Sequence, residues 1–251
     1  DTGHRHANAA PGAPRRFARY RATAPLLPGT GEHPFNRAFD GRLGLTVLDL
    51  PGLRTINDPE NLEVIQDTVK RAFPLVMVDW NALHDREKRQ KLLEEVKEAL
   101  RDLDARESMV VFVLNKIDAW NPTDTHVSTI VEELTEEFKR ALDFTEAQLI
   151  PVSGLCIYGG GRLTMSNPLA PGEAVTDALH HASFVRRKMK ERHEGDDLDA
   201  WRASRARLSE LQEAVEDGDP PPTGSFDWLA QECLTAGGND LLWEVLLDRM
   251  Q

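Results

Sequence analysis

The chain has 251 residues, 40% of them hydrophobic and 29% charged, which suits one large α/β domain or one domain with an appended module. Its formal net charge of −12 argues against a nucleic-acid-binding surface, because neutralising phosphates requires clustered Lys and Arg. No run approaches the roughly 18 consecutive apolar residues of a membrane-spanning helix. Cys156 and Cys233 lie far apart and in no metal-ligand spacing, and we expect a cytoplasmic protein.

Residues 1–41 are predicted to be poorly ordered or to be the truncated end of an upstream segment. The first residue is Asp, and residues 1–31 are rich in Ala, Pro, Gly and Arg but almost free of acidic residues. Their arginines, with Phe17 and Tyr20 between them, also fit a transit peptide or a nucleic-acid-binding arm. We favour the poorly ordered end.

Residues 42–157 are predicted to form the core of an α/β domain. Four short apolar runs are expected to be strands: 43–50, 74–80, 109–115 and 148–153. Helical patterns lie between them, at 60–72, 85–105 and 126–142. Continuous apolar runs, rather than alternating ones, are typical of strands buried on both faces in parallel sheets. The predicted fold is therefore a doubly wound, mostly parallel sheet.

Ligands bind at the carboxyl ends of the strands in such sheets. The polar side chains expected at these ends are Asp49, Asp79, Asn115 and Ser153. Asp49 is followed at once by a Pro-Gly turn, so it is either a turn residue or a group that holds a metal ion beside a phosphate. For Asp79 we favour a helix cap beside a packed Trp80 over a direct contact with a ligand.

The stretch VLNKID, residues 113–118, has a pattern that can recognise guanine. The Asp118 carboxylate can accept two parallel hydrogen bonds, from the ring N–H and the exocyclic amine of guanine, and adenine has no such pair of donors. Asn115 can connect neighbouring loops and meet the base edge, while the alkyl stem of Lys116 can lie flat against the purine ring. The alternative is an ordinary strand end followed by the start of a helix.

Three motifs, in this order, resemble those of the GTPase superfamily over residues 43–155. They are Asp49-x-x-Gly52, Asn115-Lys116-x-Asp118, and the PVSGL of 151–155, which stands where the family has a Ser-Ala-x loop. The resemblance implies a phosphate-loop GTPase-like fold that is incomplete at its N-terminus. It also implies GTP or GDP as the ligand and Mg²⁺ as the cofactor.

The same resemblance implies a role for each motif residue. Asp49 and Gly52 would be catalytic: Asp49 would reach Mg²⁺ through water, and the Gly52 amide would meet the terminal phosphate. The nucleotide-binding residues would be Asn115, Lys116, Asp118, Ser153, Gly154 and Leu155. Among them, Asn115 and Asp118 would read guanine, while Ser153 and the two backbone positions after it would close over the base.

Two features depart from the family's pattern. A phosphate-binding loop, Gly-x-x-x-x-Gly-Lys-Ser/Thr, is expected before Asp49, but the first lysine in the chain is Lys70. We expect that this loop belongs to an upstream segment; a degenerate domain, or a substitute loop at 159–162, is the alternative. Leu53 stands where small GTPases have a Gln that orients the attacking water. The chain therefore looks most like dynamin-type large GTPases, in which a dimer of G domains often completes the site.

Residues 158–235 are predicted to be a helical insertion before a closing helix at 236–251. Two helices are expected in the insertion, at 172–194 and 197–217. Helices inserted here are similar in arrangement to those of bacterial dynamin-like proteins. The basic stretch 184–193 fits a peripheral contact with acidic lipid, but we favour a solvated helix face.

The sequence therefore predicts a guanine-nucleotide-binding domain that hydrolyses GTP in its intact parent and couples hydrolysis to a conformational switch. The expected partners are GTP and GDP, a second G domain in a homodimer and a peripheral membrane surface, but not nucleic acid. The alternative is a pseudo-GTPase that serves as a scaffold or interaction module.

Overall fold

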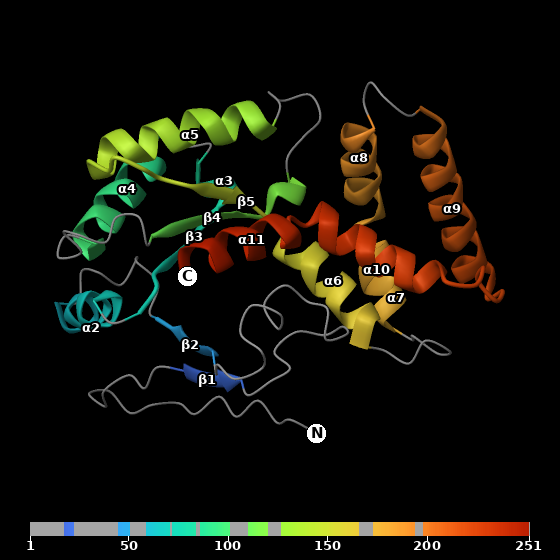
Figure 1. Cartoon of the computed structure of the whole chain (residues 1–251), viewed down its shortest axis with the longest axis horizontal. Helices are drawn as coiled ribbons and strands as arrows, with labels where there is room; N and C mark the ends of the chain where they lie inside the picture. The colour runs from blue at the N-terminus through green and yellow to red at the C-terminus, as the bar shows by residue number, and fades with distance from the viewer. Residues whose placement is uncertain are drawn as a thin grey trace.

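The computed structural model describes residues 18–22, 45–50, 59–70, 72–83, 86–100, 110–119, 127–165, 173–193 and 198–250. Across these ranges the protein is α/β, with a small parallel sheet and helices on both of its faces, as Figure 1 shows. The parallel sheet predicted from the apolar runs is therefore present, in a smaller form than expected.

The central sheet consists, in the described ranges, of three parallel strands in the order β3-β4-β5. They are β3 (Leu75–Asp79), β4 (Val111–Asn115) and β5 (Leu149–Pro151). The register pairs Asp79 with Asn115 and Leu114 with Pro151, so that the three carboxyl ends lie at one edge. These strands fall within three of the four apolar runs that predicted strands.

Helices cover both faces of β4, which explains why its sequence is apolar without alternation. Phe112 and Leu114 are fully buried with residues of α4 (Arg86–Leu100) and α5 (Val127–Leu142). Val111 and Val113 pack on the other face, in a cluster with Val245 of α11 (Asn239–Met250). Figure 1 shows α5 above the sheet, α4 to its left and α11 below it. On the α11 side, Leu75 and Met77 of β3 stay 43% and 57% exposed, so α11 protects β4 and β5 rather than β3.

Two shorter helices lie beside this core. They are α2 (Pro59–Val69), which begins at a proline, and α3 (Trp80–Leu83), which directly follows β3. Proline is favoured at the first position of a helix because that position needs no N–H. Trp80 is 2% exposed, so the packed tryptophan predicted after β3 is confirmed.

The fourth predicted strand does not belong to the parallel sheet. β2 (Leu45–Asp49) pairs antiparallel with β1 (Ala18–Ala22), in a separate sheet of two strands among the described residues. Placing 43–50 in the parallel sheet was therefore wrong, and 18–22 form a strand inside a segment predicted to lack order. A short apolar run specifies an extended chain but not its partner or direction, and Leu48 is 37% exposed.

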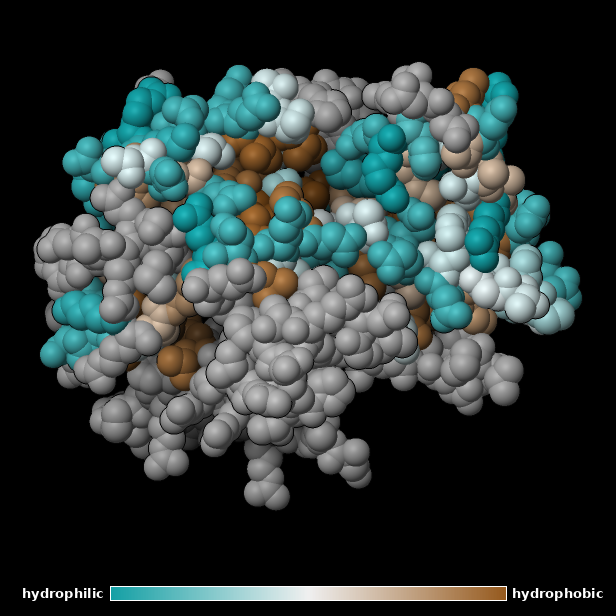
Figure 2. Space-filling view, viewed as in Figure 1, coloured by the Kyte–Doolittle hydropathy of each residue, from teal (hydrophilic) through white to brown (hydrophobic). Residues whose placement is uncertain are grey.

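Helices occupy the described part of the chain after β5. They are α6 (Gly154–Met165), α7 (Glu173–Leu179), α8 (Ala182–Arg192), α9 (Leu198–Asp217), α10 (Ser225–Ala236) and α11. α8 and α9 stand side by side in Figure 1, and hydrophilic side chains predominate over them and over α5 in Figure 2. The helices predicted at 197–217 and 236–251 correspond to α9 and α11, and the boundary predicted between 157 and 158 falls inside α6. That residues 158–235 are an insertion into a larger domain stays a prediction. None of the helices in the described ranges combines the length and apolar character that crossing a bilayer requires.

Three details of this helical part differ from the prediction. The single helix expected at 172–194 is interrupted at His180 and His181, where the His181 amide donates to the Ala178 carbonyl at 3.2 Å and ends α7. α10 was not predicted. The glycine-rich stretch 159–162, considered as a substitute phosphate loop, is instead the middle of α6. It packs closely enough that a Cβ at Gly160 would lie 2.8 Å from the Ala230 carbonyl oxygen of α10.

Candidate functional site

The carboxyl ends of β3, β4 and β5 bring several predicted site residues together. Asp79 and Asn115 are direct register partners at the ends of β3 and β4. The Val152 amide donates to the Leu114 carbonyl at 2.8 Å, which places Ser153 beside the end of β4. Because parallel strands end at a common edge, residues far apart in the sequence meet here, as the motif pattern predicted.

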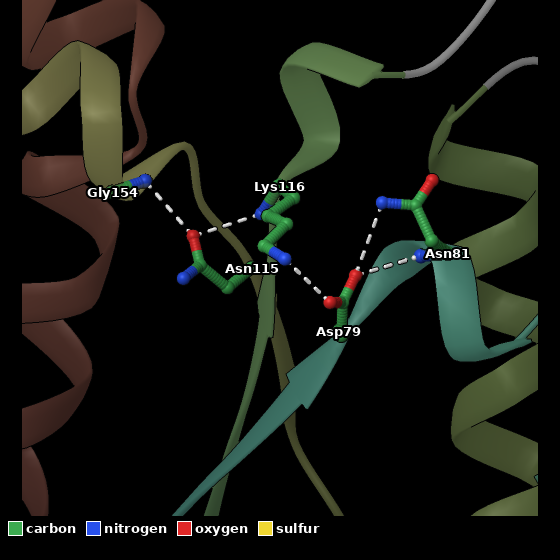
Figure 3. A network of polar contacts seen from close by, with 5 residues as sticks. All are labelled: Asp79, Asn81, Asn115, Lys116 and Gly154. Carbon is green, nitrogen blue, oxygen red and sulfur yellow. Dashed lines mark hydrogen bonds and ion pairs between the residues drawn. The ribbon is translucent and has the colours of Figure 1, made fainter.

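Asn115 connects the segment after β4 with the start of α6, as expected for a residue that ties neighbouring loops together. Its Oδ1 accepts hydrogen bonds from the Lys116 amide at 2.8 Å and from the Gly154 amide at 2.9 Å (Figure 3). Gly154 packs closely against this side chain, since a Cβ at Gly154 would lie 3.1 Å from the same oxygen. The side-chain amide therefore fixes the spacing between two loops at the edge of the sheet.

Asp118 has a buried oxygen that lacks a hydrogen bond. It lies in a short 3₁₀ helix, Ile117–Ala119, that directly follows Lys116. Its Oδ1 is buried and has no hydrogen-bond partner among the described residues. A buried acceptor without a donor costs about 1–3 kcal/mol, so a ligand that offers a donor would bind favourably here.

Asp118 also lies near the first turn of α6. A hydrogen bond with Cys233 and burial raise the pKa of the Cys156 thiol, and the nearby charge of Asp118 adds to this rise. Cys156 and Cys233 are both fully buried and are not joined by a disulfide. Both cysteines therefore pack as small buried hydrophobic side chains.

Lys116 is held between the ends of β3 and β4. Its ammonium Nζ lies 2.6 Å from Oδ2 of Asp79, and its backbone has a φ of 68°, which is uncommon for a residue other than glycine. The other carboxylate oxygen of Asp79 accepts bonds from the Asn81 amide at 2.9 Å and the Asn81 side chain at 3.2 Å. The predicted cap at the start of α3 is thereby confirmed, but the ion pair with Lys116 was missed.

Partial burial raises the pKa of Asp79, but the hydrogen bonds from Lys116 and Asn81 outweigh it and hold the pKa below its ordinary value. The carboxylate therefore stays charged at neutral pH and keeps the lysine in place. The signal in the sequence that could have revealed this pair is a carboxylate, Asp79, at the end of the strand adjacent to Asn-Lys-x-Asp.

Ser153 and Leu155 differ in what they present to a ligand. Ser153 is fully buried: its amide donates to the Gly237 carbonyl at 3.0 Å, and its Oγ accepts from the Cys156 amide at 3.2 Å. It thus caps the N-terminus of α6. Leu155 is 58% exposed and free to contact a ligand, whereas the Gly154 amide already donates to Asn115.

The predicted catalytic and metal positions are described only in part. Asp49 is the last residue of β2, and its side chain lies outside what the structure describes, as do Gly52 and Leu53. Within the described ranges, no group of three His, Cys, Asp or Glu residues is arranged to hold a metal ion. The role of Asp49 toward Mg²⁺ therefore stays a prediction.

The basic stretch on α8 is bonded to other parts of the protein at several positions. Arg186 donates to Gln212 of α9 at 2.9 Å, and Arg192 pairs with Glu232 of α10 at 2.6 Å. Lys188 pairs with Glu191 within α8 at 2.7 Å. These contacts give the stretch a role in helix packing, whereas the sequence was interpreted as a solvated helix face.

Replacing Asn115 by alanine is expected to lower the free energy of unfolding by about 1–3 kcal/mol, because two backbone donors lose their acceptor at once. Urea unfolding followed by circular dichroism measures the loss. Asn81→Ala is the matched control, since its side chain makes one exposed bond, and it should cost less than about 0.5 kcal/mol. Equal losses for the two variants would show that Asn115 does not hold the two loops together.

Comparisons with models of known protein families, with curated proteins and with solved structures give no match for this chain. What the chain does is therefore inferred from the residues at the carboxyl ends of β3, β4 and β5.

Proposed function

We propose that this chain binds guanine nucleotides through the edge of the sheet where β4 and β5 end. One observation carries the proposal: Oδ1 of Asp118 is buried without a hydrogen-bond partner among the described residues. Guanine has a ring N–H and an exocyclic amine side by side, and this pair of donors suits one carboxylate. Adenine lacks the pair and would leave the buried oxygen unpaired, so the site favours guanine.

The surroundings of Asp118 support this choice of ligand. Asn115 is fixed by its bonds to the Lys116 and Gly154 amides, and its Nδ2 remains to meet a base. The exposed Leu155 and the alkyl stem of Lys116 offer apolar surface to a purine ring. A fixed amide, a carboxylate oxygen that has no partner among the described residues, and apolar side-chain surface together suit a flat base with polar edges.

We further propose that the domain is GTPase-like and that its intact parent hydrolyses GTP. In that proposal Asp49 would hold Mg²⁺ through water, and Gly52 would donate its amide to the terminal phosphate. Bound Mg²⁺ would supply charge for the phosphates. The side chain of Asp49 and the whole of Gly52 lie outside the described residues. A dimer of G domains and a peripheral membrane contact stay predictions.

A titration of the ¹⁵N-labelled chain with GDP, ADP and xanthosine diphosphate tests base recognition. We expect GDP to bind weakly but at least about tenfold more tightly than ADP, because only guanine pairs both donors with Asp118. We expect Asp118→Asn to lower the affinity for GDP by about ten- to a hundredfold. The variant should instead favour xanthosine diphosphate, whose ring carbonyl suits an amide donor.

Asp217→Asn is the matched control, because it makes the same chemical change at an exposed side chain at the end of α9. Its affinities should equal those of the unmodified chain. Equal affinity for GDP and ADP in the unmodified chain, or no amide shift with either, would overturn the proposal.

A further inference from the structure

We propose that Asp79 is a positioning residue of the proposed guanine site. It holds the Lys116 ammonium so that the alkyl stem of the lysine contacts the base and the ammonium does not bind the phosphates. The inference rests on the proposed function and goes beyond it, because it gives Asp79 of β3 a role in the site and separates contact with the base from contact with the phosphates. The carboxylate of Asp79 acts through Lys116 and need not touch the nucleotide.

The geometry fixes Lys116 at both of its ends. Its backbone N–H donates to Oδ1 of Asn115 at 2.8 Å, and its ammonium bonds to Oδ2 of Asp79 at 2.6 Å (Figure 3). The side chain therefore spans the gap between the ends of β4 and β3. Its positive φ costs energy and persists only when neighbouring contacts hold it, and these two bonds are such contacts.

Asp79 is itself held in one orientation. Its Oδ1 accepts two bonds from Asn81, which leaves Oδ2 directed at Lys116. Register pairing with Asn115 keeps the aspartate level with the residue before the lysine. A carboxylate fixed by other bonds loses less freedom when it forms an ion pair, so this pair is better suited to positioning than one between two mobile side chains.

The ion pair between the Lys116 ammonium and the Asp79 carboxylate explains why the lysine would contact the base rather than the phosphates. The ammonium already faces one carboxylate, so less of its charge is available to phosphate oxygens. The four methylenes of Lys116 are apolar and lie along the path from Asn115 to Asp79, beside the segment that carries Asp118. Losing Asp79 should therefore weaken the contact with the base and not the contact with the phosphates.

The test compares guanosine with GDP for the full chain and for Asp79→Asn, using the same amide titration. Asparagine is isosteric and keeps an acceptor for Asn81. The side chains of Asp79 and Lys116 are 39% and 52% exposed, so solvent screens the pair. We therefore expect Asp79→Asn to lower the binding affinity by about two- to fivefold, by the same factor for guanosine and for GDP.

A double-mutant cycle asks whether Asp79 acts through the lysine. Lys116→Met keeps an unbranched apolar stem without the ammonium. In that background Asp79→Asn should change neither affinity, because the partner is gone. Glu136→Gln is the control: it removes an exposed ion pair with Lys139 on α5 and should leave both affinities unchanged. If Asp79→Asn fails to fold, Asp79→Ser keeps a capping oxygen and removes the charge.

Three results would overturn the inference while leaving the proposed function intact. In the first, Asp79→Asn raises the affinity for GDP but not for guanosine, which would make Lys116 a phosphate ligand. In the second, Asp79→Asn leaves both affinities unchanged. In the third, its effect persists in the Lys116→Met background. If instead the unmodified chain does not distinguish GDP from ADP, the proposed function fails, and this inference fails with it.

Discussion

Replacing Phe138 by alanine is expected to lower the free energy of unfolding by about 3–5 kcal/mol. Phe138 is fully buried on α5, and its ring packs edge-to-face against Phe112 of β4, with centroids 5.0 Å apart and planes 76° apart. Alanine would remove that contact and leave a cavity between the sheet and the helix that covers it. Urea unfolding of the purified variant, followed by circular dichroism, measures the loss.

Phe144→Ala is the matched control, because Phe144 also contacts Phe112, with centroids 6.4 Å apart, but is only partly buried. Its loss should be smaller than that of Phe138→Ala by at least about 1 kcal/mol, since solvent can fill the space that it leaves. A loss below about 1 kcal/mol for Phe138→Ala would contradict the packing described between α5 and β4.

Gly238→Ala is expected to cost at least about 3 kcal/mol, because two penalties act at one position. Gly238 has a φ of +81°, which an L side chain rarely adopts, and its Cβ would lie inside van der Waals contact of the Pro151 carbonyl oxygen. That oxygen belongs to the backbone of β5 and cannot move without shifting the sheet. Thermal and urea unfolding of the variant provide the measurement.

Gly218 separates the two penalties. It has a φ of +75°, but a Cβ there would meet nothing within 4 Å. Gly218→Ala should therefore cost only the backbone term, about 1 kcal/mol. If both alanine variants lost the same stability, close approach between the α10–α11 link and β5 would not be the cause at Gly238.

The sequence predicts the sheet edge well because strand ends are local features. Apolar runs end at Asp79 and Asn115, and parallel pairing then brings these residues together without further information. The link from Asn115 to the start of α6 also follows, because an amide side chain at such an end has backbone donors within reach. The buried oxygen of Asp118 could not be foreseen, since its isolation depends on every residue packed around it.

Other elements depend on contacts that local patterns do not contain. Three consecutive glycines favour a loop by propensity, yet residues 159–161 are helical in α6. Close packing explains this: a Cβ at Gly159 would lie 3.1 Å from the Ala178 backbone, and one at Gly160 still closer to Ala230. Small residues here allow α7 and α10 to approach α6. Likewise, the partner of β2 lies in a segment whose composition resembles disorder.

α10 was missed for a more local reason. The stretch 217–224, with three prolines and two glycines, is typical of the end of a helix, and the residue directly before Ser225 is Gly224 rather than a Ser, Thr, Asp or Asn that would mark a new start. Gly224, with a φ of 73°, begins the helix without a side-chain cap. Burial of Leu229, Ala230 and Cys233 stabilises it instead, and that burial depends on α6 and α8.

The position of α11 has a consequence for synthesis of the protein on the ribosome. The face of the sheet that presents Val111, Val113 and Ile150 is covered by a helix that is translated only after α6 to α10. A nascent chain that has just completed β5 therefore exposes an apolar surface that its own later residues must bury. Such long-range closure slows folding and leaves intermediates prone to aggregation, so the unfinished chain is a suitable client for chaperones that bind apolar segments.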